Sequence, residues 1–403
     1  MKRGIDVKVK VQHGRIRMLD ILRGFAILGT LGTNIWLFAN LGDLSYVLTL
    51  DRPAWWTSLD EFIRVFVLFF VNGKFLSILA ILFGVGLELK YRQSLRKGSV
   101  WPGLYIWTSL ILLAEGLIHF TLVMEYDILM SYAVTAIIVS FIVKRGDKAI
   151  QRVMAAVLVA HVSIVVLLFG AMIAAHLAGA NLSLGDMSEV VTLYKDGTWM
   201  EQVHYRLSDF WILRSEVIFV IPLNVFLFLF GIRLMRAGAF SPEERGRRIR
   251  RKMLNVGLVL GLPLNLLILV PGGMFDLPVR YLFAPLMAVG YMALIAKLVE
   301  WNPSFKLWVS VERIGKMALS CYILQNVLSS FLFYGWGLGL GGKVDALTTV
   351  LVWFAMSVCQ LGIASLWLRY FRFGPMEWLR RYIASLPAGG RMHDSKAVPK
   401  RPD

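Results

Sequence analysis

The sequence predicts an all-α, polytopic integral membrane protein with about ten transmembrane helices. Hydrophobic residues make up 57% of its 403 positions, and the mean hydropathy is +0.65. A soluble domain of this length is much more polar. Apolar runs of about 20 residues recur along the chain, and each is long enough to cross a bilayer as a helix.

Ten segments have the length and composition of membrane spans. The second is too long for one straight crossing, and we expect Asn72-Gly73 to break or bend it. We expect residues 1–386 to form one helical domain and the Pro-, Gly- and Lys-rich tail 387–403 to be disordered and cytosolic. The predicted spans are 19–39, 61–90, 101–124, 127–143, 149–178, 211–236, 253–271, 279–299, 317–335 and 346–369.

The distribution of Lys and Arg predicts that both termini face the cytosol. With that orientation the cytosolic segments hold 34 of the 43 basic residues, whereas the outer loops hold four. Positive charge accumulates on the cytosolic side of membrane proteins. The net charge of +17 therefore reflects topology and contact with membrane lipids, and we expect no nucleic-acid partner.

The stretch Glu115–Tyr132 carries the strongest candidate for chemistry. His119 lies about 18 residues from the inner end of its span, which places it roughly 27 Å up. Ionisable groups at membrane depth are costly and usually functional. Glu115, four residues earlier on the same helical face, can hold the imidazole in one tautomer, and Asp127 can do so from the next span. The alternative is a satisfied interhelical hydrogen bond.

Other polar residues also fall at the outer ends of spans, and two lie deeper. We predict that they bind the substrate or stabilise an oxyanion. The alternative is pairing between helices that only fixes their packing. The members of this set at outer ends are Asn34, Arg64, Arg214, Glu216 and Arg280, and its deeper member is Gln325; the other deep residue, Lys74, belongs to a separate predicted site.

A second polar group lies at the cytosolic end of the first span. Arg17, Asp20 and Arg23 are spaced by three, which puts them on one helical face. Asp20 can pair with one arginine, and the remaining positive charge needs an anion such as a lipid headgroup or a phosphorylated ligand. Snorkelling is the alternative for single basic residues here. We predict no metal site, because the spans lack paired histidines or a carboxylate cluster.

Five stretches, taken together and in order, resemble the recurring motifs of the YeiB-like family of bacterial membrane proteins. That family carries a domain of unknown function (DUF418). The resemblance covers nearly the whole chain and implies a multi-pass protein of the bacterial inner membrane. The stretches are RIRMLDILRGFAILGTLGTNI (15–35), NGKFLSILAILFGVGLEL (72–89), EGLIHFTLVMEYDILMSYAV (115–134), IGKMALSCYILQNVL (314–328) and FRFGPMEWLRR (371–381).

The YeiB-like family is distantly similar to transmembrane acyltransferases such as heparan-α-glucosaminide N-acetyltransferase. The shared opening is an Arg, an Asp and an Arg-Gly pair, matched here by Arg17, Asp20, Arg23 and Gly24. This similarity implies a cytosolic acyl-CoA donor, with acetyl-CoA expected first, and a central His. We expect Arg17, Asp20 and Arg23 to bind the donor, and we include Lys74 in this set.

Two further classes of function remain beside the acyltransferase. The same polar layers can be gates of a transporter or flippase for an anionic or amphiphilic solute, with Lys74 and Gln325 at its midplane. A structural or lipid-interacting protein explains the buried charges least well. In the acyltransferase, His119 is the base or the covalent carrier, and the acceptor is a sugar, glycan, lipid or amine outside the cytosol. A homodimer is compatible with all three.

Overall fold

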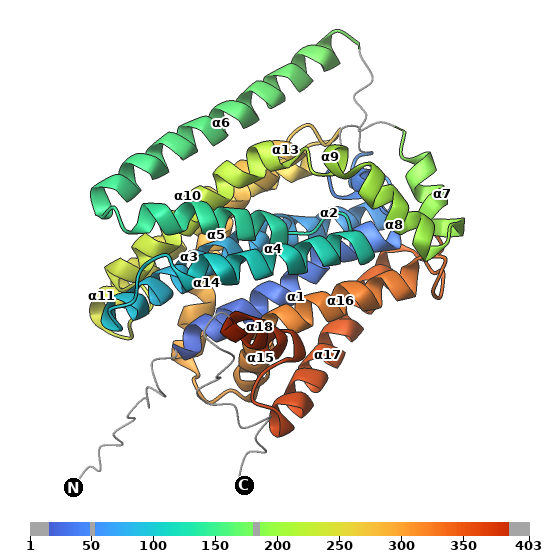
Figure 1. Cartoon of the computed structure of the whole chain (residues 1–403). Coiled ribbons are helices and arrows are strands. Elements are labelled where there is room, and N and C mark those ends of the chain that lie inside the picture. The colour runs from blue at the N-terminus through green and yellow to red at the C-terminus, as the bar shows by residue number, and fades with distance from the viewer. Residues whose placement is uncertain (1–15, 49–52, 180–185, 387–403) are drawn as a thin grey trace, which may run out of the picture.

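A computed structural model describes residues 16–48, 53–179 and 186–386, and this part of the chain is built from helices (Figure 1). The predicted disordered tail 387–403 lies outside the described residues. The helices are α1 (Arg17–Ala39), α2 (Leu59–Val71), α3 (Lys74–Arg96), α4 (Leu104–Leu122), α5 (Leu129–Val143), α6 (Asp147–Leu177), α7 (Ser188–Asp196), α8 (Trp199–Ser208), α9 (Phe210–Leu213), α10 (Val217–Ala237), α11 (Glu244–Val256), α12 (Leu262–Asn265), α13 (Asp276–Pro278), α14 (Ala284–Trp301), α15 (Lys306–Lys316), α16 (Ala318–Phe333), α17 (Ala346–Tyr370) and α18 (Pro375–Ser385), with short 3₁₀ or π turns between some of them.

The prediction of an all-helical membrane protein is confirmed. Within the described residues, eight helical stretches are long and apolar enough to cross a bilayer, and α5 and α16 are shorter apolar helices. Together they match the ten predicted segments. The predicted break is also present, because α2 ends at Val71, Gly73 takes a left-handed conformation with φ of 75°, and α3 begins at Lys74.

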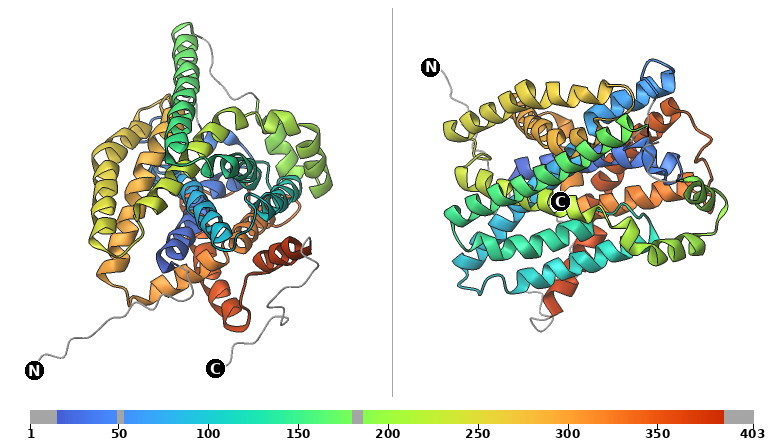
Figure 2. Two further views of the ribbon diagram at one scale, coloured as in Figure 1. Left: turned by 60° about the vertical axis from the view of Figure 1, so that its left-hand side comes forward. Right: turned by 90° about the horizontal axis from the view of Figure 1, so that it is seen from above.

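The spans differ strongly in burial. In α1 and the α2–α3 stretch, about four-fifths of the most apolar window is buried, whereas in α6 and α17 less than a quarter of it is buried. Figures 1 and 2 show α6 at the edge of the bundle, in contact with α10 and inclined away from the other helices. The short helices α7 and α8 lie at the opposite end of the bundle from α11. The α1 and α3 helices therefore form the interior around which the site is built.

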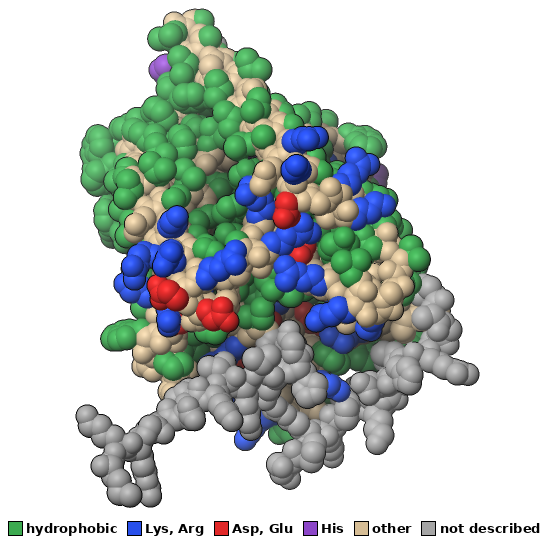
Figure 3. Space-filling model, turned by 90° about the vertical axis from the view of Figure 1, so that its left-hand side faces the viewer, with side chains coloured by type: hydrophobic (Ala, Val, Ile, Leu, Met, Phe, Trp, Pro, Cys, Tyr) green, Lys and Arg blue, Asp and Glu red, His purple; other side chains and the backbone are tan. Residues whose placement is uncertain are grey.

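Positive charge gathers on one end of the bundle. Figure 3 shows this face, where Lys and Arg side chains form a broad band. Much of it comes from α11, which carries five exposed basic residues: Arg245, Arg247, Arg248, Arg251 and Lys252. A face of this charge suits anionic lipid headgroups. The orientation of the chain in the membrane stays a prediction.

The close crossing of α3 and α10 depends on two glycines. A Cβ added at Gly84 would lie 2.0 Å from the carbonyl oxygen of Phe228, and one added at Gly231 would lie 2.1 Å from that of Ile81. Both distances are far below contact. Small residues of this kind let membrane helices pack backbone against backbone, where dispersion and weak polar contacts replace the hydrophobic effect.

We expect Gly84→Ala to destabilise the bundle, since overpacking a tight contact costs about 1–3 kcal/mol. Gly86→Ala is the matched control on the same helix, because no atom lies within 4 Å of the Cβ it would add. Thermal unfolding of the purified variants should show a loss of several degrees for Gly84→Ala only. Equal unfolding temperatures for the two variants would contradict the proposed packing.

Candidate functional site

The site is centred on a buried imidazole–carboxylate pair. His119 lies in the last turn of α4 and is 2% exposed, and Asp127 lies just before α5 and is 1% exposed. The Nδ1 atom of His119 is 2.9 Å from Oδ1 of Asp127, in a contact bent away from ideal hydrogen-bond geometry. The other carboxylate oxygen accepts a hydrogen bond of 3.0 Å from the backbone N–H of Met130. Asp127 is thereby fixed at the start of α5.

Two asparagines complete a polar chain with this pair. Asn34 of α1 donates from Nδ2 to Oδ1 of Asn326 in α16, at 3.2 Å. This contact turns the Asn326 amide nitrogen toward Nε2 of His119, also at 3.2 Å. Assigned from this network, Nε2 is the acceptor and Nδ1 carries the proton that faces Asp127.

This arrangement has the parts of a general base. An acidic residue faces one ring nitrogen and favours a single tautomer, which makes the other nitrogen a proton acceptor, as in other His-carboxylate pairs. In this structure Nε2 accepts from the Asn326 amide, and a substrate hydroxyl or amine would take the place of that amide. Tyr322 lies beside the imidazole, with ring centroids 5.2 Å apart. Among the described residues, no group of three or more His, Cys, Asp or Glu could hold a metal ion.

Glu115 was the other residue predicted to orient the imidazole, and the structure gives it a different partner. Its carboxylate forms an ion pair with Arg380 of α18, through Nε at 2.9 Å and a second short contact to Nη2. The spacing of four residues does place Glu115 and His119 on the same side of α4. Arg380 nevertheless holds Glu115, and Asp127 is the carboxylate that contacts the imidazole.

Gly116 permits the close approach of α4 and α5 that brings the pair together. A Cβ at this position would lie 2.7 Å from the backbone nitrogen of Met130 and 3.0 Å from Oδ2 of Asp127. A larger side chain would therefore push Asp127 away from its place beside His119. This explains why a glycine stands one turn before the histidine.

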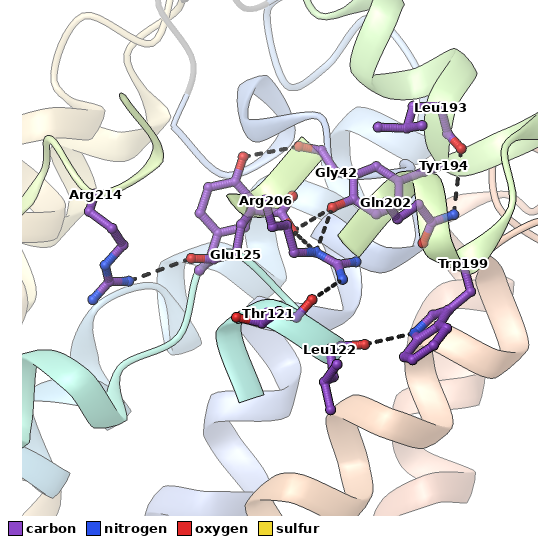
Figure 4. Close-up of polar contacts among 11 residues, drawn as sticks. Gly42, Thr121, Leu122, Glu125, Leu193, Tyr194, Trp199, Gln202, Arg206 and Arg214 are labelled. Carbon is purple, nitrogen blue, oxygen red and sulfur yellow. Dashed lines mark hydrogen bonds and ion pairs between the residues drawn. The ribbon is translucent and has the colours of Figure 1, made fainter. Parts of the chain in front are cut away.

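The connection between His119 and Asp127 is held from the outer side by α8 (Figure 4). Arg206, which is fully buried, donates to the carbonyl oxygen of Thr121 at 2.9 Å and to the hydroxyl of Tyr194 at 3.1 Å. It also forms an ion pair of 3.4 Å with Glu125. Tyr194 donates to the Glu125 carboxylate at 2.6 Å. We call Glu125, Tyr194 and Arg206 the outer clamp.

Two further side chains bind the same connection. Trp199 donates from Nε1 to the carbonyl oxygen of Leu122 at 2.9 Å. Arg214 donates to the carbonyl oxygen of Asp127 at 2.8 Å and to the hydroxyl of Ser131 at 3.2 Å. Figure 4 shows the Trp199 contact and the side chain of Arg214 reaching this connection. The guanidinium of Arg214, predicted to bind substrate, is thus engaged with the protein backbone.

The outer clamp depends on a protonated phenol. Burial and the nearby Glu125 carboxylate raise the pKa of Tyr194 well above its ordinary value. Tyr194 therefore keeps its proton across the physiological pH range and donates it to Glu125.

A cavity of about 400 Å³, which we call the inner cavity, extends from the basic end of the bundle toward His119. Its basic lining residues are Arg23, Lys90, Lys316, Arg380 and Arg381. Its opposite end is formed by Ile128, Tyr132 and Tyr322. It therefore joins a cluster of positive charge to the residues that pack around the His119–Asp127 pair.

A smaller, polar cavity of about 70 Å³, the outer chamber, lies on the other side of the pair. Asp127 and Asn34 line it, together with the predicted substrate-binding residues Glu216 and Arg280. Ile128 and Tyr132 border both the inner cavity and the outer chamber. Only a thin layer of side chains separates the two cavities at this point.

The remaining predicted donor-binding residues lie apart from the inner cavity. Arg17 donates to Glu312 at 2.9 Å and to the carbonyl oxygen of Pro303 at 3.2 Å, and thereby ties α1 to α15. Asp20 forms an ion pair of 3.0 Å with Arg23. Lys74 is fully buried near the Phe69 ring and does not line the inner cavity. Arg23 is thus the member of this set that faces the cavity.

Three more predicted residues have structural partners. Arg64 pairs with Glu61 at 2.5 Å on the same helix, and its guanidinium lies 5.0 Å from the Tyr46 ring centre. Gln325 accepts a hydrogen bond from Gln360 of α17 at 3.2 Å. Arg280 lines the outer chamber but also donates to Asn72 at 3.0 Å.

Sequence reasoning did not single out several residues of the site. Asn326 stands next to the predicted Gln325, and the two point to different neighbours because adjacent helical residues are about 100° apart. Arg380 and Arg381 lie within the stretch FRFGPMEWLRR, and Lys90 lies at the predicted inner edge. Their position at a cytosolic helix end was the available signal, although it does not distinguish a ligand-binding residue from a snorkelling one.

We expect Arg206→Gln to loosen the connection between His119 and Asp127, because it removes the buried cation that balances Glu125. Breaking one partner of such a buried pair costs about 3–5 kcal/mol locally. Hydrogen exchange of the amides in 121–128 should become at least about tenfold faster. His204→Gln, an exposed change on the same helix, is the control, and unchanged exchange in Arg206→Gln would refute the clamp.

Comparison with known proteins finds similarity to uncharacterised proteins. Residues 234–387 match the family described as Protein of unknown function (DUF418). The chain is 28% identical to the uncharacterised protein YxaH of Bacillus subtilis over 91% of its length and 93% of that protein. It is 29% identical to the uncharacterised protein YeiB of Escherichia coli over 92% of its length and 96% of that protein. No solved structure matches it.

The family match begins in α10 and ends just after α18, so it includes Asn326 and Arg380 but not His119. The two full-length similarities extend over α4 and α5 as well. The predicted resemblance is confirmed: the chain is similar over most of its length to YxaH and YeiB, and its C-terminal part matches the DUF418 family.

Proposed function

We propose that this protein is a transmembrane acyltransferase of the bacterial inner membrane, which moves an acyl group from cytosolic acyl-CoA to an acceptor on the outer side. One observation carries the proposal: the inner cavity links five basic side chains to the residues around a buried His119–Asp127 pair. The motif of Arg17, Asp20, Arg23 and Gly24, which resembles that of known transmembrane acyltransferases, supports it further.

The inner cavity suits a CoA thioester with acetyl-CoA as the first candidate. Its basic mouth provides partners for phosphate groups, and charge-assisted hydrogen bonds from Arg to phosphate are among the strongest in proteins. Its volume of about 400 Å³ lies within the range of small-molecule sites and leaves room for the pantetheine arm. The thioester would reach Tyr322, beside the imidazole.

In the proposed reaction, Nε2 of His119 accepts the proton of an acceptor hydroxyl or amine. The acceptor oxygen or nitrogen attacks the thioester carbonyl carbon and forms the new bond, and the carbon–sulfur bond breaks. The imidazolium then returns the proton to the departing thiolate, which leaves as CoA with a free thiol. Asp127 stabilises the imidazolium, as the carboxylate does in other triads.

The outer chamber is the proposed entrance for the acceptor group. It is polar, and Asn34, Glu216 and Arg280 offer hydrogen-bond donors and acceptors to a hydroxyl or amine. Asn34 also belongs to the chain that reaches His119 through Asn326. These features support a sugar, a glycan, a lipid headgroup or a small amine as the acceptor.

His119→Gln should abolish acyl transfer and leave the fold intact, because Gln cannot cycle a proton at neutral pH. His161→Gln is the matched control, since His161 is also buried in a span but lies between two carbonyl oxygens, at 3.1 Å from Phe219 and 2.9 Å from Tyr281. The assay measures thiol release from acetyl-CoA by inverted membrane vesicles that contain the native acceptors. Full activity in His119→Gln would rule out the mechanism.

Arg381→Gln should weaken CoA binding about tenfold, because it removes one cation from the mouth of the inner cavity. Arg372→Gln is the control: both guanidinium groups lie against the Phe373 ring, but Arg372 does not line the cavity. Thermal stabilisation of the purified protein by CoA, compared with pantetheine, measures the effect. Equal stabilisation of the two variants would contradict a phosphate site in this cavity.

A transporter or flippase is the second candidate, and one observation favours it. The inner cavity and outer chamber are separated only by the layer of Ile128 and Tyr132, as expected of two gates around a central site. The thiol-release assay separates the two candidates, because a transporter leaves the thioester bond of acetyl-CoA intact.

A further inference from the structure

A third cavity, the lateral groove, opens beside His119 between α4, α16 and α18. Its volume of about 480 Å³ exceeds those of the inner cavity and the outer chamber. Neither of those two cavities is lined by the imidazole, whereas the lateral groove is. Its lining residues are Trp107, Leu110, Ile111, Ala114, Glu115, Ile118, His119, Leu122, Val123, Ile323, Met376, Leu379 and Ile383.

The lateral groove is apolar apart from two ionisable side chains. Glu115 is engaged with Arg380, which leaves His119 as the group available for chemistry. On the outside of the groove, Leu110, Ile118 and Leu122 are 43%, 58% and 39% exposed. In a membrane, this side faces hydrocarbon. The groove therefore connects the bilayer interior with the imidazole.

The lateral groove and the inner cavity lie back to back. The same helices form the wall between them, with neighbouring residues on opposite sides. On α4, Leu112 lines the inner cavity and Ile111 the groove, and on α16, Tyr322 lines the inner cavity and Ile323 the groove. The neighbouring rings of His119 and Tyr322 are tilted by 38°, and His119 lines the groove whereas Tyr322 lines the inner cavity.

The polar part of this wall is one ion pair. Arg380 lines the inner cavity, and its partner Glu115 lines the lateral groove. Phosphate groups that enter the inner cavity compete with Glu115 for the guanidinium. Binding of the donor would thus weaken the contact that separates the two cavities.

We propose that the lateral groove holds the hydrocarbon chain of the donor's acyl group, so that the donor is a medium- or long-chain acyl-CoA. This inference rests on the proposed acyltransferase function and replaces acetyl-CoA as the preferred donor. The CoA phosphates bind at the basic mouth, the thioester lies beside His119, and the chain continues into the groove.

Available space argues for this occupant. A chain attached to a carbonyl at His119 must extend away from the sulfur, and the pantetheine arm takes the inner cavity. The outer chamber has only about 70 Å³ and is lined by Arg280 and Glu216, which an alkyl chain would desolvate. The lateral groove is the adjoining space that is both large and apolar. The outer chamber and the groove share no lining residue, and the His119–Asp127 contact lies between them.

The chain length of the donor gives a direct test. Each buried methylene strengthens binding about three- to fourfold, and we therefore expect octanoyl-CoA to bind at least about tenfold more tightly than acetyl-CoA. The purified protein in nanodiscs is loaded with radiolabelled acetyl-CoA, which is displaced by unlabelled acetyl-, butyryl- or octanoyl-CoA. Empty nanodiscs correct for partition of octanoyl-CoA into lipid.

Ala114→Trp should remove the preference for octanoyl-CoA, because the indole fills the groove. Ala114 is exposed on the groove wall, so retained acetyl-CoA binding reports that the variant is folded. Ala114→Phe provides a smaller plug if Ala114→Trp does not fold. The matched control is Leu117→Trp, since Leu117 is 43% exposed on the same helix and does not line the groove.

The outcomes separate this inference from the proposed function. Equal affinity for acetyl- and octanoyl-CoA overturns the groove assignment and leaves the acyltransferase standing. A preference for octanoyl-CoA that Ala114→Trp and Leu117→Trp change equally also overturns it, because the chain would then lie in ordinary bilayer lipid. If no CoA ester of any length binds, the proposed function fails and this inference fails with it.

Discussion

The contact between the His119 imidazole and the Asp127 carboxylate is the interaction on which the outer half of the bundle depends. Both groups are almost completely buried, and an unpartnered polar group in hydrocarbon costs several kcal/mol. The structure satisfies them with α1 and α16 on one side and the backbone of α5 on the other. Asn34 and Asn326 are buried for the same reason, because each completes the hydrogen bonds of the next group in the chain.

Two buried arginines near the His119–Asp127 pair serve backbone groups. Arg206 and Arg214 both donate to carbonyl oxygens between residues 121 and 127, where the chain leaves α4 and has not yet entered α5. Helix ends leave carbonyls without intrahelical partners, and a membrane offers no water to satisfy them. Arg214, which was predicted to bind substrate, and Arg206 therefore support the His119–Asp127 pair indirectly, because they fix the segment that sets its geometry.

The sequence predicted the spans well because hydropathy and length are local properties. The break at Asn72-Gly73 could be predicted for the same reason, because the left-handed conformation that interrupts the helix belongs to the glycine itself. Partners between helices were harder to predict. From spacing alone, Glu115 and Asp127 were equally good candidates to contact the His119 imidazole. Which of them does so depends on Arg380, which pairs with Glu115 and lies 265 residues away from it in the chain.

The same limit applies on α16. Gln325 and Asn326 are neighbours of similar chemistry in one apolar run, and a sequence gives no rotation of the helix about its axis. That rotation turns Asn326 toward His119 and Gln325 toward Gln360. It is set by packing against α1 and α17, which no local pattern encodes.

The tight packing of the interior favours transfer of a group over movement of a whole solute. A transporter must part its central helices, yet α3 and α10 meet backbone to backbone at Gly84 and Gly231, and the Tyr132 hydroxyl ties α5 to the carbonyl oxygen of Leu76 at 2.7 Å. The proposed acyltransferase needs only the reacting atoms of donor and acceptor to meet near the layer of Ile128 and Tyr132, while the large, charged part of the donor stays in the inner cavity. A rigid bundle with a narrow central layer therefore suits acyl transfer better than transport. The reactants can be held in place while the layer stays closed to ions.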